Sequence, residues 1–218
     1  MCIRVSVETD LDDKESLHRG FRSYMNYCAS CHELGYARYE RTADDLGIPH
    51  DLVLANLVFD DSLIGDLIEN AMSEDGAKSW FGAAPPDLTL AGRVHSPDWL
   101  YTYLKSFYND PSRPLGANNK IYANVGMPNV LHELQGDVEC DDHGSGNPLD
   151  CELHRVDGTG SLSEREFDNL IADLVNFMYY VGEPGRENRQ AIGIWVLAFL
   201  GLLYICLLYT SPSPRDRY

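Results

Sequence analysis

Residues 191–209, AIGIWVLAFLGLLYICLLY, contain no charged side chain and constrain this chain more than any other segment. At about 1.5 Å per residue, a helix of this length spans roughly 28 Å, close to the hydrocarbon thickness of a bilayer. The alternative is a helix buried in a soluble core. Because the run is apolar on every side and lies near one end of the chain, we expect a single transmembrane anchor.

The rest of the chain is acidic. There are 34 Asp and Glu residues against 17 Lys and Arg, which gives a net charge of −17. Residues 1–185 alone hold 32 acidic and 13 basic side chains, a net charge of −19. Clustered Lys and Arg are needed to bind phosphate backbones, so nucleic acid is excluded as the main partner. An acidic surface suits a basic protein partner, although it also serves solubility alone.

These shifts in composition predict three parts. Residues 1–185 form a folded domain, residues 186–209 a linker and membrane anchor, and residues 210–218 a tail of doubtful origin. The first twenty residues carry five acidic side chains and no apolar stretch, so we expect no export signal within them.

Four segments before the anchor have apolar residues at helical spacing, and a start signal precedes two of them. Ser96-Pro97-Asp98 is typical of a helix N-terminus, and Ser163 with Glu166 forms a capping box. Long loops rich in Gly, Pro and Asn separate the helices, and no alternating strand pattern persists. We predict a mainly α fold with long loops, which a large bound group would organise. The predicted helices cover about 16–28, 61–72, 97–108 and 163–182.

The segment Cys28-Ala-Ser-Cys31-His32 has the C-x-x-C-H spacing of covalent haem c attachment. Two thiols three residues apart lie on one turn, where both can form thioethers to one edge of a haem, and the adjacent imidazole can bind the iron. A redox dithiol is an alternative, but it is typical of a βαβ context. Half of a zinc site is another, but Cys140 and Cys151 form no second C-x-x-C pair.

Met127 is the predicted second axial ligand. It lies between Gly126 and Pro128, in a loop that gives its side chain no helical face to cover, whereas the other methionines are terminal or lie on predicted helices. A haem held by His and Met is typical of cytochromes c.

Further cofactor-binding residues are predicted between the motif and Met127. Pro85 and Pro86 stiffen their segment and would form a wall against a flat ligand, unless this is an ordinary loop. Arg93 and His95 precede the helix that begins near Trp99, and they would bind haem propionates by charge-assisted hydrogen bonds.

Taken together, these segments resemble the cytochrome c1 family, bacterial type, whose members are haem subunits of the ubiquinol–cytochrome c reductase (cytochrome bc1) complex. The resemblance runs in family order over roughly residues 9–209. Its matching pieces are Arg19-Gly20, Cys28 to His32, Leu34 to Tyr39, Asp45-Leu46-Gly47, Trp80-Phe81-Gly82, Pro85 to Leu88, Trp99 to Tyr103, Gly126-Met127-Pro128, Gly182-Glu183-Pro184 and the anchor.

The resemblance implies a cytochrome c-like haem domain with one covalent haem c, axial ligands His32 and Met127, and thioethers at Cys28 and Cys31. It also implies that Trp99, Pro85 and Pro86 belong to the pocket. Family members usually carry Arg where His95 stands, so Arg93 is the alternative propionate partner.

The resemblance also implies a role and a location. The chain would pass single electrons from a Rieske iron–sulfur protein to a soluble cytochrome c, with no substrate chemistry of its own. It would lie beside cytochrome b in the lipid of the bacterial inner membrane, as a single-pass protein with a periplasmic haem domain, in a dimeric parent complex.

Cys140 and Cys151 flank a short insertion, residues 141–150. In an oxidising compartment, a disulfide that closes this loop would stabilise the fold by about 2–4 kcal/mol; the alternative is two free thiols. The nearby residues 157–167 look like a calcium-binding EF-hand loop, but Arg155 stands where the first acidic ligand belongs. We predict an ordinary turn there.

Two other functions remain open from the sequence. A membrane-anchored haem-based redox or gas sensor would need an open or labile sixth position on the iron. A non-haem structural subunit would use Cys28 and Cys31 as a disulfide.

Overall fold

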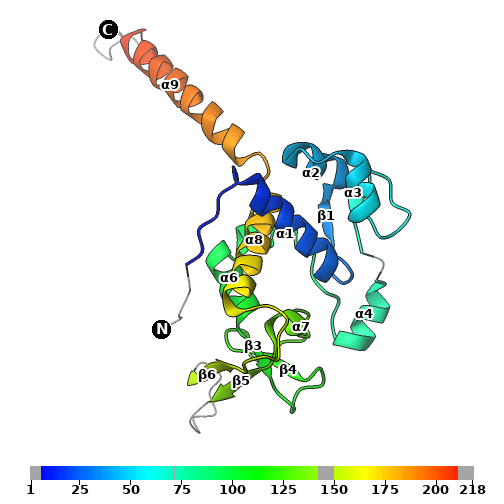
Figure 1. Cartoon of the computed structure of the whole chain (residues 1–218). Helices are drawn as coiled ribbons and strands as arrows, with labels where there is room; N and C mark the ends of the chain where they lie inside the picture. The colour runs from blue at the N-terminus through cyan, green and yellow to red at the C-terminus, as the bar shows by residue number, and fades with distance from the viewer. Residues whose placement is uncertain (1–5, 71, 142–149, 211–218) are drawn as a thin grey trace. The chain divides into compact units, whose positions relative to one another are not determined.

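The computed structural model describes residues 6–70, 72–141 and 150–210, and the chain divides into two compact units, Met1–Gly182 and Glu183–Tyr218 (Figure 1). The division lies close to the predicted domain boundary at 185/186. The predicted tail falls outside the described residues except for Thr210, and so does most of the insertion between Cys140 and Cys151.

Two long helices frame the first unit. Helix α1 (Lys14–Tyr27) begins at Asp13, whose carboxylate accepts a hydrogen bond from the Ser16 N–H, and it packs against α8 (Glu164–Gly182). The ring of Phe21 stacks on Phe177 with centroids 5.1 Å apart. Gly20 permits this approach, because a Cβ there would lie 2.6 Å from the Cβ of Phe177. Both predicted helices are confirmed.

The start signals act as predicted. The N–H of Ser163 donates to the Glu166 carboxylate over 2.9 Å, and the Glu166 N–H donates back to the Ser163 hydroxyl at the start of α8. Helix α6 (Pro97–Lys105) begins at Ser96, whose hydroxyl accepts from the Trp99 N–H. This helix ends three residues before the predicted limit, because the chain continues into strand β3 (Phe107–Asn109).

The predicted helix over 61–72 is wrong. Residues 67 and 68 form strand β2 (Leu67–Ile68), which pairs antiparallel with β1 (Leu34–Arg38). Ile68 is fully buried whereas Leu63 is 70% exposed, so the apolar residues do not share one face. The Asp66 carboxylate accepts from the Leu63 N–H over 2.7 Å, a local bond that competes with helix formation.

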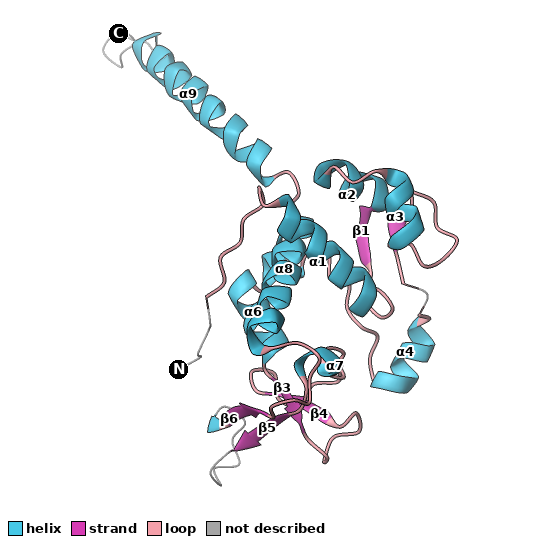
Figure 2. Cartoon of the chain, in the orientation of Figure 1, coloured by secondary structure: helices cyan, strands magenta, loops and turns pink. Residues whose placement is uncertain are grey.

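Shorter elements complete the first unit, and the described residues are mainly helical, as predicted (Figure 2). Helix α5 packs closely on α8, since a Cβ at Gly92 would lie 2.7 Å from the Met178 carbonyl oxygen. Two further antiparallel pairs are present, β3 with β4 and β5 with β6. These elements are α2 (Tyr39–Leu46), α3 (His50–Asn56), α4 (Glu74–Phe81), α5 (Ala91–Val94), β3 (Phe107–Asn109), β4 (Ala117–Asn119), α7 (His132–Gln135), β5 (Val138–Asp141) and β6 (Glu152–Arg155).

A disulfide joins Cys140 on β5 to Cys151, which directly precedes β6, with the two Cα atoms 5.4 Å apart. The EF-hand look-alike, residues 157–167, forms turns and bends over 157–162 and then enters α8. There the Arg155 guanidinium donates to the Leu162 carbonyl oxygen.

The second unit is one long helix, α9 (Arg186–Thr210). Its stretch from Asn188 to Thr210 has a mean hydropathy of 2.6 and buries nothing within the chain, and it is the only helix among the described residues that is long and apolar enough to cross a membrane. This fits the predicted single-pass anchor.

Candidate haem-binding site

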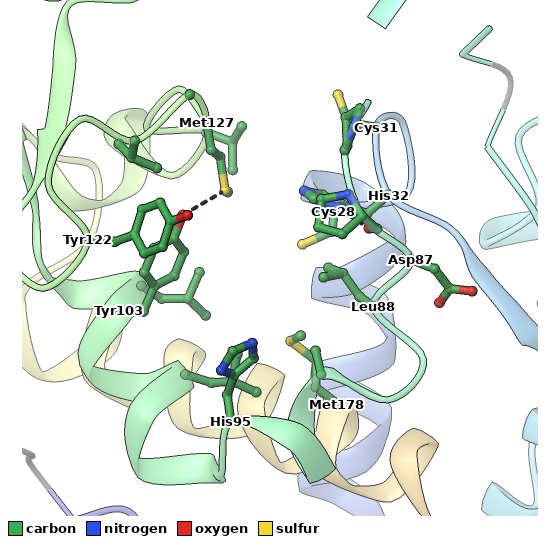
Figure 3. Close-up of a pocket in the computed structure, with 18 of the residues that line it drawn as sticks. Cys28, Cys31, His32, Asp87, Leu88, His95, Tyr103, Tyr122, Met127 and Met178 are labelled. Atoms are coloured by element: carbon green, nitrogen blue, oxygen red, sulfur yellow. Dashed lines mark hydrogen bonds between the residues drawn. The ribbon is translucent and has the colours of Figure 1, made fainter. Parts of the chain in front are cut away.

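A cavity of about 600 Å³ opens inside the first unit, and its lining is mostly apolar. This volume is in the range typical of sites for cofactors and other small molecules. The predicted cofactor-binding residues converge on it, with the exception of Arg93 (Figure 3). Those that line the cavity are Cys28, Cys31, His32, Pro85, Pro86, His95, Trp99 and Met127.

The C-x-x-C-H motif forms a tight turn at the end of α1. The Cys28 N–H donates to the Tyr24 carbonyl, and the His32 N–H donates to the Cys28 carbonyl over 2.9 Å. The Tyr24 hydroxyl in turn donates to the His32 carbonyl over 3.0 Å. The turn therefore presents both thiols and the imidazole to one cavity.

The environment of Cys28 argues against a redox dithiol. Burial raises the pKa of its thiol to about 12, with a smaller contribution from Cys31. Thiol–disulfide chemistry proceeds through the thiolate, which is favoured at exposed, electropositive positions. A buried thiol beside an apolar cavity is suited to a covalent attachment that is made once and kept.

The imidazole of His32 is oriented by the proline segment. Its Nδ1 lies 2.8 Å from the carbonyl oxygen of Pro86. A carbonyl oxygen only accepts, so Nδ1 carries the hydrogen and Nε2 keeps the lone pair that a metal needs. Burial lowers the pKa of His32 and the bond to Pro86 partly opposes this, so the imidazole is neutral at pH 7.

The segment that holds Pro85 and Pro86 is fastened along the exit of the motif. The Leu88 N–H donates to the Glu33 carbonyl over 2.9 Å, and the Gly35 N–H donates to the Asp87 carboxylate over 3.2 Å. The other oxygen of that carboxylate accepts from the N–H and the hydroxyl of Thr89, each over 2.6 Å. The prolines therefore form a fixed wall, and Pro86 fixes the orientation of His32 as well.

Met127 lies on the opposite wall. Figure 3 shows its sulfur and the His32 ring on opposite sides of the cavity, with the sulfur directed inward. The Tyr103 hydroxyl lies 3.6 Å from this sulfur and donates a hydrogen bond to it.

A row of aromatic rings lines the cavity between these walls. The ring of His95 stacks on Trp99 with centroids 4.3 Å apart, and Trp99 stacks on Tyr103 with centroids 5.0 Å apart. Arg93 does not share this position. Arg93 is exposed near the end of α5 and does not line the cavity, whereas His95, the residue that caps this helix, does.

Several residues that line the cavity are not predicted from the sequence. Met178, assigned to the core, is buried on α8 and also contributes to the lining, one turn after Leu174. Tyr103 and Tyr122 line it too. The spacing of Trp99 and Tyr103 at i and i+4 was a usable signal for Tyr103, whereas nothing local marked Tyr122.

The donor set fits one haem c. Two thiols and a neutral imidazole stand on one wall, a thioether stands on the other, and apolar and aromatic side chains lie between them. This is the set that covalent attachment and His/Met ligation require. Fold and site together define a c-type haem protein with a candidate membrane anchor.

Comparison with known proteins gives the family. The family model described as the Cytochrome C1 family matches residues 61–215. The chain is 48% identical to the cytochrome c1 of Allochromatium vinosum, over 92% of this chain and 83% of that protein. It is 42% identical to a Nitrosomonas europaea protein named ammonia monooxygenase gamma subunit, over 95% of this chain and 86% of that protein. It is 26% identical to the cytochrome c1 of Rhodospirillum rubrum, over 90% of this chain and 79% of that protein.

The chain belongs to the cytochrome c1 family. The family match begins beyond Cys28 and His32, so the haem motif supports this membership independently. Membership confirms the predicted haem-carrying electron-transfer subunit of the cytochrome bc1 complex, with one covalent haem c.

Proposed function

We propose that this chain accepts single electrons from a Rieske iron–sulfur protein and passes them to a soluble cytochrome c, with His32 and Met127 as the axial ligands of its haem. The observation that carries the proposal is the pair of donor side chains facing each other across one apolar cavity. The haem supplies a reversible one-electron redox couple when it is bound.

The protein's own residues would attach the haem, orient its histidine ligand and shield it from water. Cys28 and Cys31 would hold one edge of the haem on the turn after α1. The Pro86 carbonyl keeps the His32 imidazole in one tautomer, and such partners of a ligating histidine raise its basicity. The aromatic row and the prolines would cover much of a bound haem, and such shielding from water helps to set the reduction potential. No side chain is required to move a proton, so the subunit needs no substrate chemistry of its own.

The proposed surroundings follow from the family and from α9. The helix would anchor the chain in the bacterial inner membrane beside cytochrome b, with the haem unit in the periplasm and the parent complex dimeric. The relatives support membership of such a complex. The length and hydropathy of α9 support a single span.

Visible spectroscopy of Met127→Leu beside the unchanged protein tests the ligand assignment. We expect a pyridine haemochrome spectrum of haem c from both proteins. The reduced unchanged protein should not bind carbon monoxide, whereas the reduced variant should bind it readily, because leucine offers no lone pair.

Met178→Leu is the matched control, since it removes another thioether from the same cavity, and it should behave as the unchanged protein. Carbon monoxide binding by the unchanged protein would favour the sensor function instead. A purified protein without haem, made in a host that matures cytochromes c, would overturn the proposal.

A further inference from the structure

Tyr103 and Met127 meet across 24 residues of chain through the bond from hydroxyl to sulfur. A thioether can only accept, so the hydroxyl is the donor. A thioether sulfur has two lone pairs. The hydroxyl engages one of them and leaves the other available to a metal.

The Tyr103 ring has little freedom to take the hydroxyl elsewhere. It lies nearly parallel to the Trp99 ring, with an interplanar angle of 8°. The ring of Phe107 meets it edge-on at 5.2 Å, and the ring of Tyr122 at 6.4 Å. Packing on several sides therefore sets the direction of the hydroxyl.

A fully buried carboxamide ties the backbone of Tyr103 to the segment that leads to Met127. Asn119 donates from Nδ2 to the Tyr103 carbonyl over 2.8 Å. Its Oδ1 accepts from the N–H groups of Ile121 and Tyr122 over 3.0 and 3.1 Å. Buried polar groups satisfied in this way hold a single arrangement.

A second clamp acts closer to Met127. The Asn118 side-chain oxygen accepts from the Asn124 N–H over 2.9 Å, and the Arg113 guanidinium donates to the Asn124 carbonyl over 3.1 Å. Asn124 has a φ of +62°, a left-handed conformation that needs support from its surroundings. These bonds fix the backbone three residues before Met127.

We propose that Tyr103 is a positioning residue for the Met127 sulfur. Asn118 and Asn119 keep the Tyr103 hydroxyl and this sulfur within hydrogen-bond distance of each other. The inference rests on the proposed ligation by Met127. A donor on the sulfur withdraws electron density from it, which makes it a weaker ligand for the oxidised iron. The bond therefore favours the reduced state and raises the reduction potential.

Tyr103→Phe tests this in the haem-loaded, full-length protein, because it keeps the stacked ring and removes only the hydroxyl. We expect the midpoint potential to fall, with the ratio of reduced to oxidised protein at a fixed potential dropping by about two- to tenfold. A tenfold drop corresponds to about 59 mV for one electron. The charge-transfer band of methionine-ligated ferric haem should weaken or shift.

Tyr122→Phe is the matched control. It removes a hydroxyl from the same cavity, and no described hydrogen bond joins that hydroxyl to Met127. Its midpoint reduction potential and its charge-transfer band should equal those of the unchanged protein. An equal fall of the midpoint in both variants would mean that any lost hydroxyl has this effect, which would overturn the assignment to Tyr103.

Asn118→Asp tests the clamp separately. The new side chain keeps an oxygen that can accept from the Asn124 N–H. In the unchanged protein Asn118 Nδ2 donates to the Asp110 carboxylate over 2.9 Å, and the variant replaces this bond with repulsion between two carboxylates. On heating, the charge-transfer band should be lost at a lower temperature than the helical circular dichroism. Simultaneous loss of both signals would contradict a local role for the clamp.

The two proposals fail in different ways. If Tyr103→Phe matches the unchanged protein in midpoint and band while Met127→Leu abolishes the band, the positioning role is overturned and the ligand assignment stands. If Met127→Leu leaves the band intact, the ligand assignment fails and the positioning role fails with it.

Discussion

The Nδ1–H of His32 donates a hydrogen bond to the carbonyl oxygen of Pro86, 54 residues further along the chain. One bond thereby joins the haem motif to the proline wall and selects the imidazole nitrogen that remains free. The Pro86 carbonyl is held in place for this bond because the residues that follow it, Asp87 and Leu88, are hydrogen-bonded to the exit of the motif. The position of the proline wall and the orientation of the His32 imidazole therefore depend on each other.

Asp87→Ala should loosen this arrangement. The substitution removes the acceptor of the Gly35 N–H and of the buried Thr89 N–H, and buried donors without a partner cost about 1–3 kcal/mol each. We expect the free energy of unfolding, measured with denaturant on the haem-loaded protein, to fall by about 1–3 kcal/mol, mainly through Thr89, because Gly35 is only half-buried. Asp61→Ala, at an exposed position, is the control and should change it little. Equal effects of both substitutions would contradict a specific role for Asp87.

Stability should fall at alkaline pH through Tyr180. Burial and the hydrogen bond to Asp45, over 2.8 Å, raise the pKa of this hydroxyl. A pKa raised in the folded state contributes stability below the unfolded value of about 10, and this is lost as pH rises above it. The difference in unfolding free energy between unchanged protein and Tyr180→Phe should be about 1.5–3 kcal/mol at neutral pH. Above pH 10 it should shrink by about 1.4 kcal/mol per pH unit.

Tyr36→Phe, at a side chain 78% exposed, serves as the control for this titration. Its difference from the unchanged protein should not vary in the same pH window. A pH-independent difference for Tyr180→Phe would show that burial of this hydroxyl does not couple folding to its ionisation.

The disulfide should be detectable by intact mass. Alkylation of the denatured protein without reductant should leave Cys140 and Cys151 unmodified, and reduction first should add two alkyl groups. The double variant Cys140→Ser/Cys151→Ser should lose about 2–4 kcal/mol of unfolding free energy, since the closed loop restricts the unfolded chain. Alkylation of both thiols without reductant would rule out the bridge.

Electron transfer to a basic soluble cytochrome c should slow as salt concentration rises. The net charge of −17 attracts a basic partner, and salt screens this attraction. Stopped-flow rates measured over a range of ionic strength test the prediction, with an acidic cytochrome c as the opposite control. Rates that do not depend on salt would exclude electrostatic steering by this chain.

The parts of the fold that sequence predicted are those with a long local period or a start signal. Helices α1, α6 and α8 each repeat their apolar face over two turns or more, and α9 stands out because its apolar run is unbroken. The short helices α2, α3 and α4 offer too few turns for such a pattern to stand out. The error at 61–72 arose because Leu67 and Ile68 are apolar for a reason that spacing cannot reveal, namely pairing with β1.

The candidate site divides in the same way. Cys28, Cys31 and His32 could be predicted because their chemistry depends on spacing within five residues, and Met127 because of its unusual loop. All four line the cavity, and their roles toward haem stay predictions. The contributions of Tyr103 and Asn119 depend on contacts between distant segments, and an asparagine in a polar loop gives no local sign that it is fully buried.

The close crossing at Gly20 has a consequence for how the protein is made. Helix α1 emerges early from the ribosome, but the residues it packs against, Asp173 and Phe177, are translated only near the end of the chain. Until then the aromatic face of α1 lacks the α8 residues on which it packs. Closure of the first unit around the haem motif therefore has to wait for α8.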